Sequence, residues 1–336
     1  MHISVVIPVF NRAHLIERTI ESILAQDFDD FDLSIVDDAS TDETVDIVRK
    51  YEINPRVKIF INKINLGLTG NWNRCIELAK GPLVQIVQSD DLIDSNYLSN
   101  VETVFNLFPQ VGFVAASCRH IDINDKIIGS GTTYPPKLSE AGDDAIITLF
   151  TRGHPHVSSI VIKKECFGVV GKYNEKIWTA PDVEMDTRIV SKYAYYHLGS
   201  IFTSFRRHGS NRGNIEFLRT DYLETFELGL RLCWGYLTLD GREKMRIHDL
   251  NLFIDKQVSS MALSGSIASI AYSRPDSTKR YLLQALRRDK SVIIKSRFWK
   301  GIAALLLPKF SSKIVQKKMS MTLDDISRFD SYKNNL

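Results

Sequence analysis

Paired carboxylates follow two apolar runs in the first hundred residues. Asp37 and Asp38 come after one such run, and Asp90 and Asp91 come after another. Mg²⁺ and Mn²⁺ take oxygen ligands, and these cations commonly share one or two carboxylates with the phosphates of a substrate. The second pair therefore indicates a divalent-cation site, and capping of the next helix by one of its aspartates is the competing interpretation.

The segments around these aspartates alternate between the periods of strands and helices. This alternation predicts an α/β fold with a doubly wound, mostly parallel sheet. Ligands bind at the carboxyl ends of such strands, so both aspartate pairs are expected at one edge. Ser40 and Glu43 have the spacing of a capping box at the start of the second helix. The expected strands are 3–9, 33–36, 57–61 and 83–87, and the expected helices are 15–24, 41–50 and 70–79.

The pattern changes after residue 110. We place a domain boundary near residue 215, in the glycine- and asparagine-containing loop 209–214. Before it, strands are expected at 111–116, 157–162 and 201–205, with a hairpin turn at 122–126 leading into Ile127 and Ile128. After it, apolar residues that recur every three or four positions predict helices at 217–237, 242–263 and 277–287.

Four motifs in sequence order resemble those of family 2 glycosyltransferases of the bacterial surface-polysaccharide type. They read ISVVIPVFN at 3–11, IVDDASTD at 35–42, NLG at 65–67 and QSDD at 88–91. The resemblance covers roughly residues 1–215. It implies the GT-A fold, with a nucleotide-sugar-binding half at 1–110 and an acceptor half at 111–215. The spacing of apolar residues adds a helical C-terminal region at 216–336.

The resemblance also implies a donor site and a metal site. Asp38 is expected to accept a hydrogen bond from a uracil imide, with Asp37 supporting it. Arg206, Arg207 and His208 resemble an Arg-x-His element that closes the donor site, although a solvated basic loop is the alternative. The implied metal is Mn²⁺ or Mg²⁺, held by Asp91 and His208. The implied donor-binding residues are Pro8, Val9, Phe10, Asn11, Asp37, Asp38, Asn65, Ser89, Asp90 and Arg207.

A further match, VVGKYNE at 169–175 followed by APDVEMD at 180–186, resembles the family's glycine-rich turn and its base motif. It implies Asp182 as the general base of an inverting transfer, with Glu184 as the fallback, since Pro181 stands where the family usually has Glu. His154 and His156 form a His-x-His pair, which without a third ligand is weak evidence for zinc. Their expected role is structural, or that of a loop near the acceptor.

The formal charge of +3 hides a strong asymmetry. Residues 279–318 carry twelve Lys or Arg and only one acid, Asp289, whereas residues 1–278 sum to −7. Apolar residues interleave with the cations, which is typical of an interfacial amphipathic helix and argues against a nucleic-acid-binding arm. We expect peripheral contact with the inner membrane through 279–318. Packing of this segment on the acidic catalytic domain is the alternative, and homo-oligomerisation through the C-terminal helices stays open.

The cysteines and the apolar runs bear on the compartment. Four cysteines, all far apart, form no C-x-x-C pair and fit a reducing cytoplasm. The chain opens directly on a strand-like run, without the pattern of a signal peptide. The run 302–307 is too short to span a bilayer. The expected location is therefore cytoplasmic, at the inner face of the membrane.

The resemblance therefore implies a metal-dependent, inverting glycosyltransferase that moves a hexosyl or N-acetylhexosaminyl group. The donor is a nucleotide-diphosphate sugar, most simply a UDP-sugar, and the acceptor is a hydroxyl of a glycan or lipid-linked glycan. The Gln-x-x-Arg-Trp element of processive synthases is absent from the sequence, which favours single addition. Two alternatives remain, a sugar-phosphate nucleotidyltransferase and a non-catalytic scaffold that binds nucleotide sugar or membrane.

Overall fold

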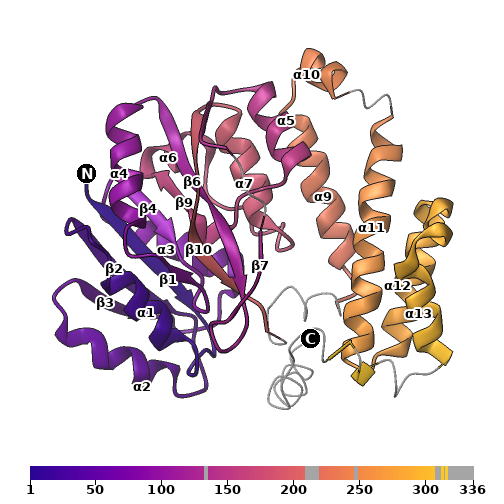
Figure 1. Ribbon diagram of the computed structural model, residues 1–336, viewed down its shortest axis with the longest axis horizontal. Helices are drawn as coiled ribbons and strands as arrows, with labels where there is room; N and C mark the ends of the chain where they lie inside the picture. The colour runs from indigo at the N-terminus through magenta and orange to yellow at the C-terminus, as the bar shows by residue number, and fades with distance from the viewer. Residues whose placement is uncertain (132–134, 209–218, 246–248, 307–311, 314, 317–336) are drawn as a thin grey trace. The chain divides into compact units, whose positions relative to one another are not determined.

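The computed structural model describes two compact units, drawn in Figure 1. The first contains 1–121, 125–206 and 235–241, and the second contains 122–124, 207–234 and residues from 242 onward. The described residues are 1–131, 135–208, 219–245, 249–306, 312–313 and 315–316. The predicted boundary near 215 and its loop 209–214 lie outside these residues, as does part of the basic segment.

The first unit is built on one mixed sheet. Its strands are β1 (Ile3–Val9), β2 (Phe31–Asp37), β3 (Val57–Ile61), β4 (Leu83–Ile86), β5 (Leu92–Ile93), β6 (Val111–Ile121), β7 (Ile127–Ser130), β8 (Lys137–Ser139), β9 (Ile160–Lys163) and β10 (Ala194–Arg206). Its helices are α1 (Ile16–Leu24), α2 (Thr44–Arg49), α3 (Gly67–Leu78), α4 (Tyr97–Leu107), α5 (Asp143–Arg152), α6 (Lys164–Val170) and α7 (Pro181–Val190), with 3₁₀ turns η1 (Lys50–Ile53) and η2 (Val157–Ser159).

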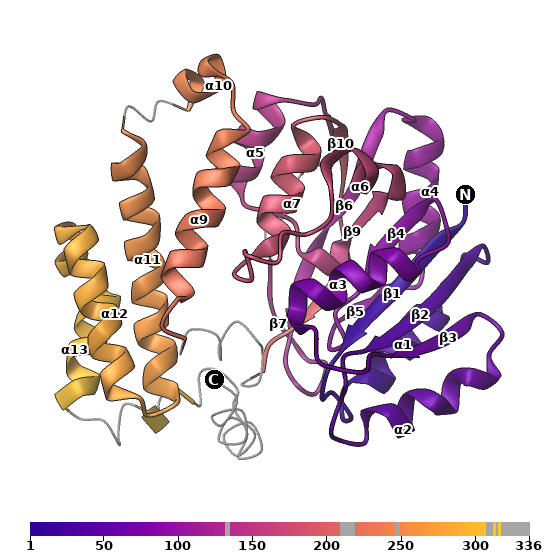
Figure 2. The same ribbon diagram turned by 180° about the vertical axis from the view of Figure 1, so that it is seen from behind.

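The first half of the sheet confirms the predicted doubly wound pattern. Strands β3, β2, β1 and β4 lie side by side in that order and are parallel. Every residue of β1 is buried, as expected of a central parallel strand covered on both faces. Helix α3 packs against β1, β2 and β4, and Figure 2 shows it in front of these strands. The carboxyl ends of β1, β2 and β4 therefore present their following loops at one edge.

The second half of the sheet is mixed. Strand β9 runs antiparallel to both β4 and β6, whereas β10 runs parallel to β6. The strand predicted at 157–162 begins as the 3₁₀ turn η2, so only its second part joins the sheet. The strand predicted at 201–205 is the end of β10, which spans 13 residues. The predicted hairpin is confirmed, since β7 pairs with β6 in antiparallel fashion.

The predicted capping box at Ser40 and Glu43 does not form. Glu43 precedes α2 without a side-chain cap bond. The Ser40 hydroxyl instead accepts the Asn11 N–H at 2.9 Å, and the Asp42 carboxylate accepts the Thr44 N–H at 3.0 Å. The serine is therefore engaged by the loop after β1, which ties the two loops at the end of the neighbouring strands β1 and β2 to each other.

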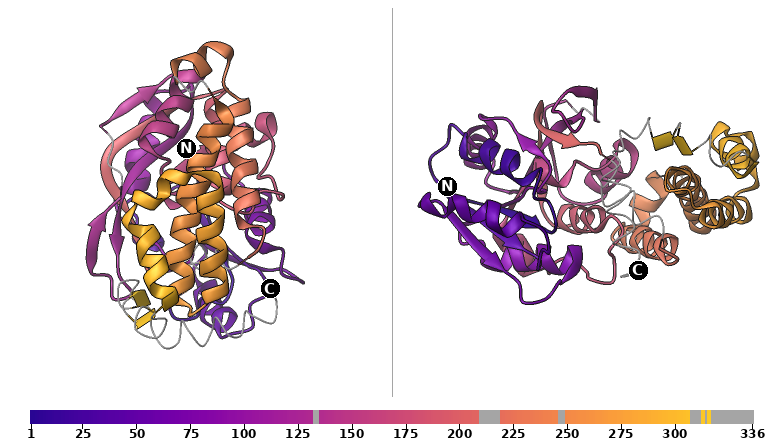
Figure 3. Two further views of the ribbon diagram at one scale, coloured as in Figure 1. Left: turned by 90° about the vertical axis from the view of Figure 1, so that its right-hand side faces the viewer. Right: turned by 90° about the horizontal axis from the view of Figure 1, so that it is seen from below.

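The second unit consists of helices in the residues that the structure describes. They are α9 (Tyr222–Gly235), the end of α10 (Leu239–Lys244), α11 (Leu250–Ala271), α12 (Pro275–Arg288) and α13 (Ser296–Leu306), with the 3₁₀ turn η3 (Lys290–Ile294). Helices α11, α12 and α13 lie side by side in all views of Figure 3. None of the described helices is long and apolar enough to cross a bilayer.

The predicted amphipathic helix at 277–287 buries its apolar side within the helical unit. Tyr281 and Leu282 of α12 are buried, and the Leu282 side chain lies directly over Gly301 of α13. Arg288 at the end of α12 pairs with Glu227 of α9 and with Asp255 of α11, each at 2.7 Å. Part of the apolar surface and part of the charge of the basic segment are thus used for internal packing.

We expect Gly112→Ala to destabilise the first unit by about 1–3 kcal/mol through overpacking. A Cβ at this position of β6 would lie 2.5 Å from the Tyr193 Cβ and 3.2 Å from the Cys166 Sγ. The matched control Gly168→Ala, in α6, meets open space and should keep stability or raise it by up to about 1 kcal/mol. Urea unfolding compares the two variants, and equal midpoints would contradict this packing.

Candidate active site

Asp91 is a fully buried carboxylate just beyond the end of β4. Its Oδ2 accepts the Ser158 hydroxyl at 2.6 Å, and its Oδ1 accepts the Arg206 N–H at 3.1 Å. Ser158 lies in η2 and Arg206 is the last residue of β10, so three distant segments meet at one side chain. Burial and the neighbouring Asp90 raise the pKa of Asp91 well above its usual range. The site is thus fixed around a carboxyl that is costly to ionise.

Asp90 is the more open member of this pair. Its side chain is 12% exposed, compared with 1% for Asp91, and its carboxylate lies 3.6 Å from the Arg12 Nε. Its backbone carbonyl accepts the Arg206 Nε–H at 2.8 Å. The Arg206 guanidinium is fully buried and also pairs with Asp125. Arg206 thus holds the turn through both its backbone and its side chain, and the Asp90 carboxylate lies beside Arg12.

The His-x-His pair lies against two different carboxylates. The His156 Nδ1 is 3.5 Å from the Asp91 Oδ2, and its ring packs on Phe205 with centroids 4.5 Å apart. The His154 Nδ1 is 3.7 Å from the Asp186 Oδ2. The structure therefore brings these histidines to the predicted site. Their spacing in the sequence carried no sign of this, because the contacts depend on where β9 inserts.

Asp182 lies in the first turn of α7 and is half-buried. Ala180, with a left-handed φ of 50°, and Pro181 start the helix immediately before it. Burial and Asp186 raise the pKa of Asp182, while His156 and His154 act in the opposite direction. Asp182 therefore shares the electrostatic environment of both histidines, one of which contacts Asp91.

The other acids of α7 are buried. Both Glu184 oxygens accept hydrogen bonds, from the Tyr236 hydroxyl and from the Arg188 guanidinium, each at 2.9 Å. Burial raises the pKa of Asp186 well above its usual range, and its Oδ2 has no hydrogen-bond partner. Burial also lowers the pKa of the adjacent His154 to about 4. Glu184 is thus committed to packing, and Asp182 is the acid of α7 that remains partly open.

Asp38 organises the loop before α3. Its carboxylate accepts hydrogen bonds from the Asn62 Nδ2 at 2.9 Å, the Leu66 N–H at 2.8 Å and the Gly67 N–H at 3.0 Å. The Asn65 side chain donates to the Asp38 carbonyl at 3.0 Å. Helix α3 begins at Gly67, so this aspartate caps its first turn. The NLG motif and the first aspartate pair therefore form one unit of structure.

Asp37 is buried at the end of β2. Its Oδ1 accepts the Ser40 N–H at 2.9 Å, and its Oδ2 has no hydrogen-bond partner. Burial, opposed by the bonds from Ser40, raises the pKa of this carboxyl. Asp37 is thus held by the turn that follows its own strand.

The remaining predicted residues differ in how open they are. Pro8 and Val9 are buried within β1, whereas Phe10 and Asn11 are half-exposed beyond its end. Ser89 is buried. Of the predicted PVFN segment, a ligand at this edge of the sheet therefore meets Phe10 and Asn11 first. Arg207 and His208 follow β10 directly and belong to the second unit, so their roles stay predictions.

The donor set fits a cation that is shared with a substrate rather than enclosed by protein. Among the described residues, no group of three His, Cys, Asp or Glu side chains is placed to hold a metal. The Asp90 and Asp91 carboxylates are adjacent, and the buried Asp91 would gain from a nearby positive charge. One or two carboxylates with substrate phosphates are a common arrangement for Mg²⁺.

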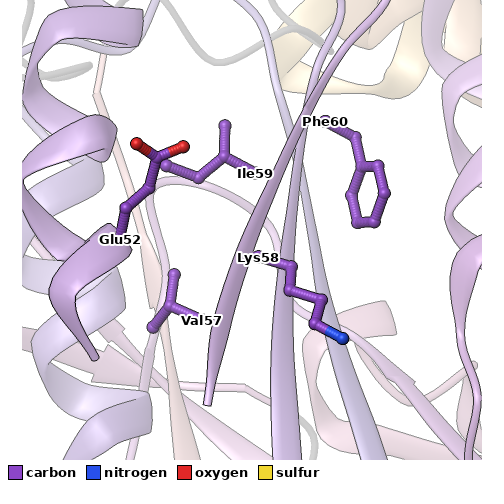
Figure 4. A pocket seen from close by; sticks show the side chains of 5 residues that line it. All are labelled: Glu52, Val57, Lys58, Ile59 and Phe60. Atoms are coloured by element: carbon purple, nitrogen blue, oxygen red, sulfur yellow. The ribbon is translucent and has the colours of Figure 1, made fainter. Parts of the chain in front are cut away.

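A shallow cavity of about 370 Å³ lies elsewhere, along the edge strand β3. It is lined by Glu52, Val57, Lys58, Ile59 and Phe60, which Figure 4 shows. None of these residues belongs to the predicted site. The cavity therefore shares no lining residue with the predicted site.

The sequence and the fold both match known proteins. Residues 4–147 match the family described as glycosyl transferase family 2. The chain is 27% identical over 210 residues to a chondroitin synthase of Pasteurella multocida, a match that covers 62% of this chain and 21% of that enzyme. It is 32% identical over 224 residues to an uncharacterized glycosyltransferase of Nostoc sp., covering 63% of this chain and 66% of that protein. The chain thus spans about a fifth to two thirds of these relatives.

A solved structure shares the fold over the whole chain. The crystal structure of S. aureus TarS 1-349 in complex with UDP-GlcNAc aligns with 100% of this chain and 92% of that chain, with a TM-score of 0.60 and 18% identity. At this identity the likeness concerns the fold. The predicted GT-A fold with C-terminal helices is thereby confirmed.

We expect Asp186→Asn to raise the free energy of unfolding at neutral pH. The folded protein holds a proton on Asp186 that the unfolded chain releases near pH 4, so wild-type stability falls as the pH rises from there to the raised pKa. A pKa that differs by one between the folded and unfolded states changes the stability by about 1.4 kcal/mol. The difference in the free energy of unfolding between Asp186→Asn and wild type should therefore become smaller as the pH is lowered toward 4. Urea unfolding across this range tests it, and a gain that does not change with pH would contradict it.

Proposed function

Residues 4–147 match glycosyl transferase family 2, and we propose that the chain transfers a sugar from a UDP-sugar to a hydroxyl of a glycan or lipid-linked glycan, with inversion at the anomeric carbon. Two relatives support the substrate classes. The TarS structure contains UDP-GlcNAc, and the Pasteurella enzyme is named a chondroitin synthase. We propose that the donated group is a hexosyl or N-acetylhexosaminyl group.

The observation that carries this proposal is the position of His156. It lies 3.5 Å from Asp91 at the end of β4, and it also acts electrostatically on Asp182 at the start of α7. Asp91 belongs to the predicted diphosphate side of the site and Asp182 to the predicted acceptor side. The shared histidine therefore supports a single reaction centre between them.

Asp182 would act as the general base. The acceptor oxygen forms a bond to the anomeric carbon while the bond from that carbon to the diphosphate breaks. The proton of the acceptor hydroxyl passes to the Asp182 carboxylate, and UDP leaves with the electron pair. A raised pKa makes Asp182 a stronger base than an ordinary aspartate. Glu184, with both oxygens bonded, is less suited to this role.

The donor would lie along the edge formed by the loops after β1, β2 and β4. Asp38 has three hydrogen bonds to the loop 62–67, so its first contribution is to hold this loop in place. Phe10 and Asn11 are the open residues of the PVFN segment and would border the base and ribose.

A divalent cation, Mn²⁺ or Mg²⁺, would be held by Asp90 and Asp91. When bound with the diphosphate, it would offset the negative charge that develops on the leaving nucleotide. The Arg206 side chain holds the backbone of this turn, because its Nε–H donates to the Asp90 carbonyl.

We expect Asp182→Asn to lower the transfer rate by roughly 10²–10⁴-fold, because the acceptor proton loses its base. UDP binding should persist, since this residue is assigned to the acceptor. For wild type, the rate should fall as the pH drops through the pKa of Asp182, which burial places above the usual range of an aspartate. A UDP-release assay over a pH series measures both effects.

Asp29→Asn is the matched control for this substitution. Its side chain is 97% exposed and it should leave the rate unchanged. Full transfer activity of Asp182→Asn, with intact folding, would refute the assignment of the base.

We expect UDP with Mn²⁺ to raise the melting temperature of the full chain. A ligand at about one hundred times its Kd adds about 2.7 kcal/mol of stability. Asp90→Asn should remove the part of the shift that depends on Mn²⁺, since Asp90 is the open carboxylate of the pair. Differential scanning fluorimetry with UDP, with Mn²⁺ and with both measures the shifts, and uridine serves as the control without phosphates.

Two results would overturn the proposed function. One is the lack of any shift with a panel of nucleotide sugars in the presence of Mn²⁺. The other is turnover of a sugar phosphate and a nucleoside triphosphate with release of pyrophosphate, which would identify a nucleotidyltransferase.

A further inference from the structure

Exposed apolar side chains gather at the junction of η3 and α13. Ile294 is 82% exposed, Trp299 58% and Ile293 48%. The Trp299 indole N–H donates to the Ile293 carbonyl at 2.7 Å, which places the ring beside the 3₁₀ turn. We call Ile293, Ile294 and Trp299 together the Trp299 surface.

Buried neighbours fix this surface in place. Val292, next to the two isoleucines, is buried, and Phe298 is buried with its ring edge-to-face against Trp299, with centroids 5.6 Å apart. Helix α13 stays apolar on its outward side beyond Trp299, because Ala303 and Leu306, four and seven positions further on, are exposed. The exposed residues therefore belong to a packed unit that presents them outward.

Cations surround the Trp299 surface. Lys290, Lys295 and Lys300 are exposed, and the stretch 290–306 contains no acidic residue. The preceding acid, Asp289, accepts the Ser291 N–H at 2.9 Å. These lysines differ from Arg288, whose guanidinium pairs with two acids inside the helical unit.

We propose that the Trp299 surface inserts into the interface of a bilayer that contains anionic lipids. Its isoleucines and tryptophan would enter the boundary between headgroups and acyl chains, and its lysines would meet lipid phosphates. The indole N–H is already bonded within the protein, so the ring can leave water without an unpaired donor. A second copy of the chain would bring the same cations and be repelled. This goes beyond the proposed transfer reaction and does not depend on it.

Co-sedimentation of the full chain with vesicles tests this. Binding to vesicles of phosphatidylglycerol and phosphatidylcholine is expected at low salt, with weaker binding to phosphatidylcholine alone and at high salt. The double variant I293S/I294S should bind at least about tenfold more weakly, since burying one isoleucine side chain contributes more than a factor of ten to a binding constant. Replacing Lys290, Lys295 and Lys300 by glutamine should remove the dependence on phosphatidylglycerol.

I53S and L239S are the matched controls, because these residues are 93% and 76% exposed in the first unit. They should bind vesicles as wild type does, and melting curves establish that all variants are folded. Unchanged binding of I293S/I294S, or no binding of wild type to anionic vesicles, would overturn the proposal. A wild-type dimer in light scattering that this double variant dissociates would instead identify a second copy as the occupant.

Discussion

The Asp91 carboxyl is buried, and donors from two other segments hold both of its oxygens. The Ser158 hydroxyl comes from the turn before β9, and the Arg206 N–H comes from the last residue of β10. A buried carboxyl is stable only where such bonds replace water. The placement of β9, β10 and the histidine segment is therefore tied to one side chain.

The surroundings of each carboxylate also explain why acidic residues in similar motifs have different roles. Asp38 follows β2 and Asp91 lies in the turn between β4 and β5, yet the first caps a helix and the second joins distant segments. In α7, Glu184 is neutralised by Arg188 while Asp182 remains partly open. The environment of each carboxyl, rather than its motif, decides whether it packs, binds or takes up a proton.

The first half of the fold could be predicted from the sequence because each strand is a continuous apolar run that ends at polar residues. β1 and β3 have the predicted bounds. The prediction of a capping box was wrong because Ser40 is bound by Asn11, a residue 29 positions away. The contacts of His156, Ser158 and Arg206 could not be foreseen either, since they depend on an antiparallel strand that inserts between β4 and β6. Local patterns carry no information on such long-range pairing.

The contact between Asp91 and Arg206 spans 115 positions of the chain. The family match ends at residue 147, so it includes neither of the residues that donate to Asp91, Ser158 and Arg206. During synthesis, β1 to β4 emerge before residue 206, so the Asp90–Asp91 turn lacks its bonds to Arg206 until β10 has been made. Closing such a long loop is slow. The last strand of the first unit's sheet thus completes the surroundings of the candidate site.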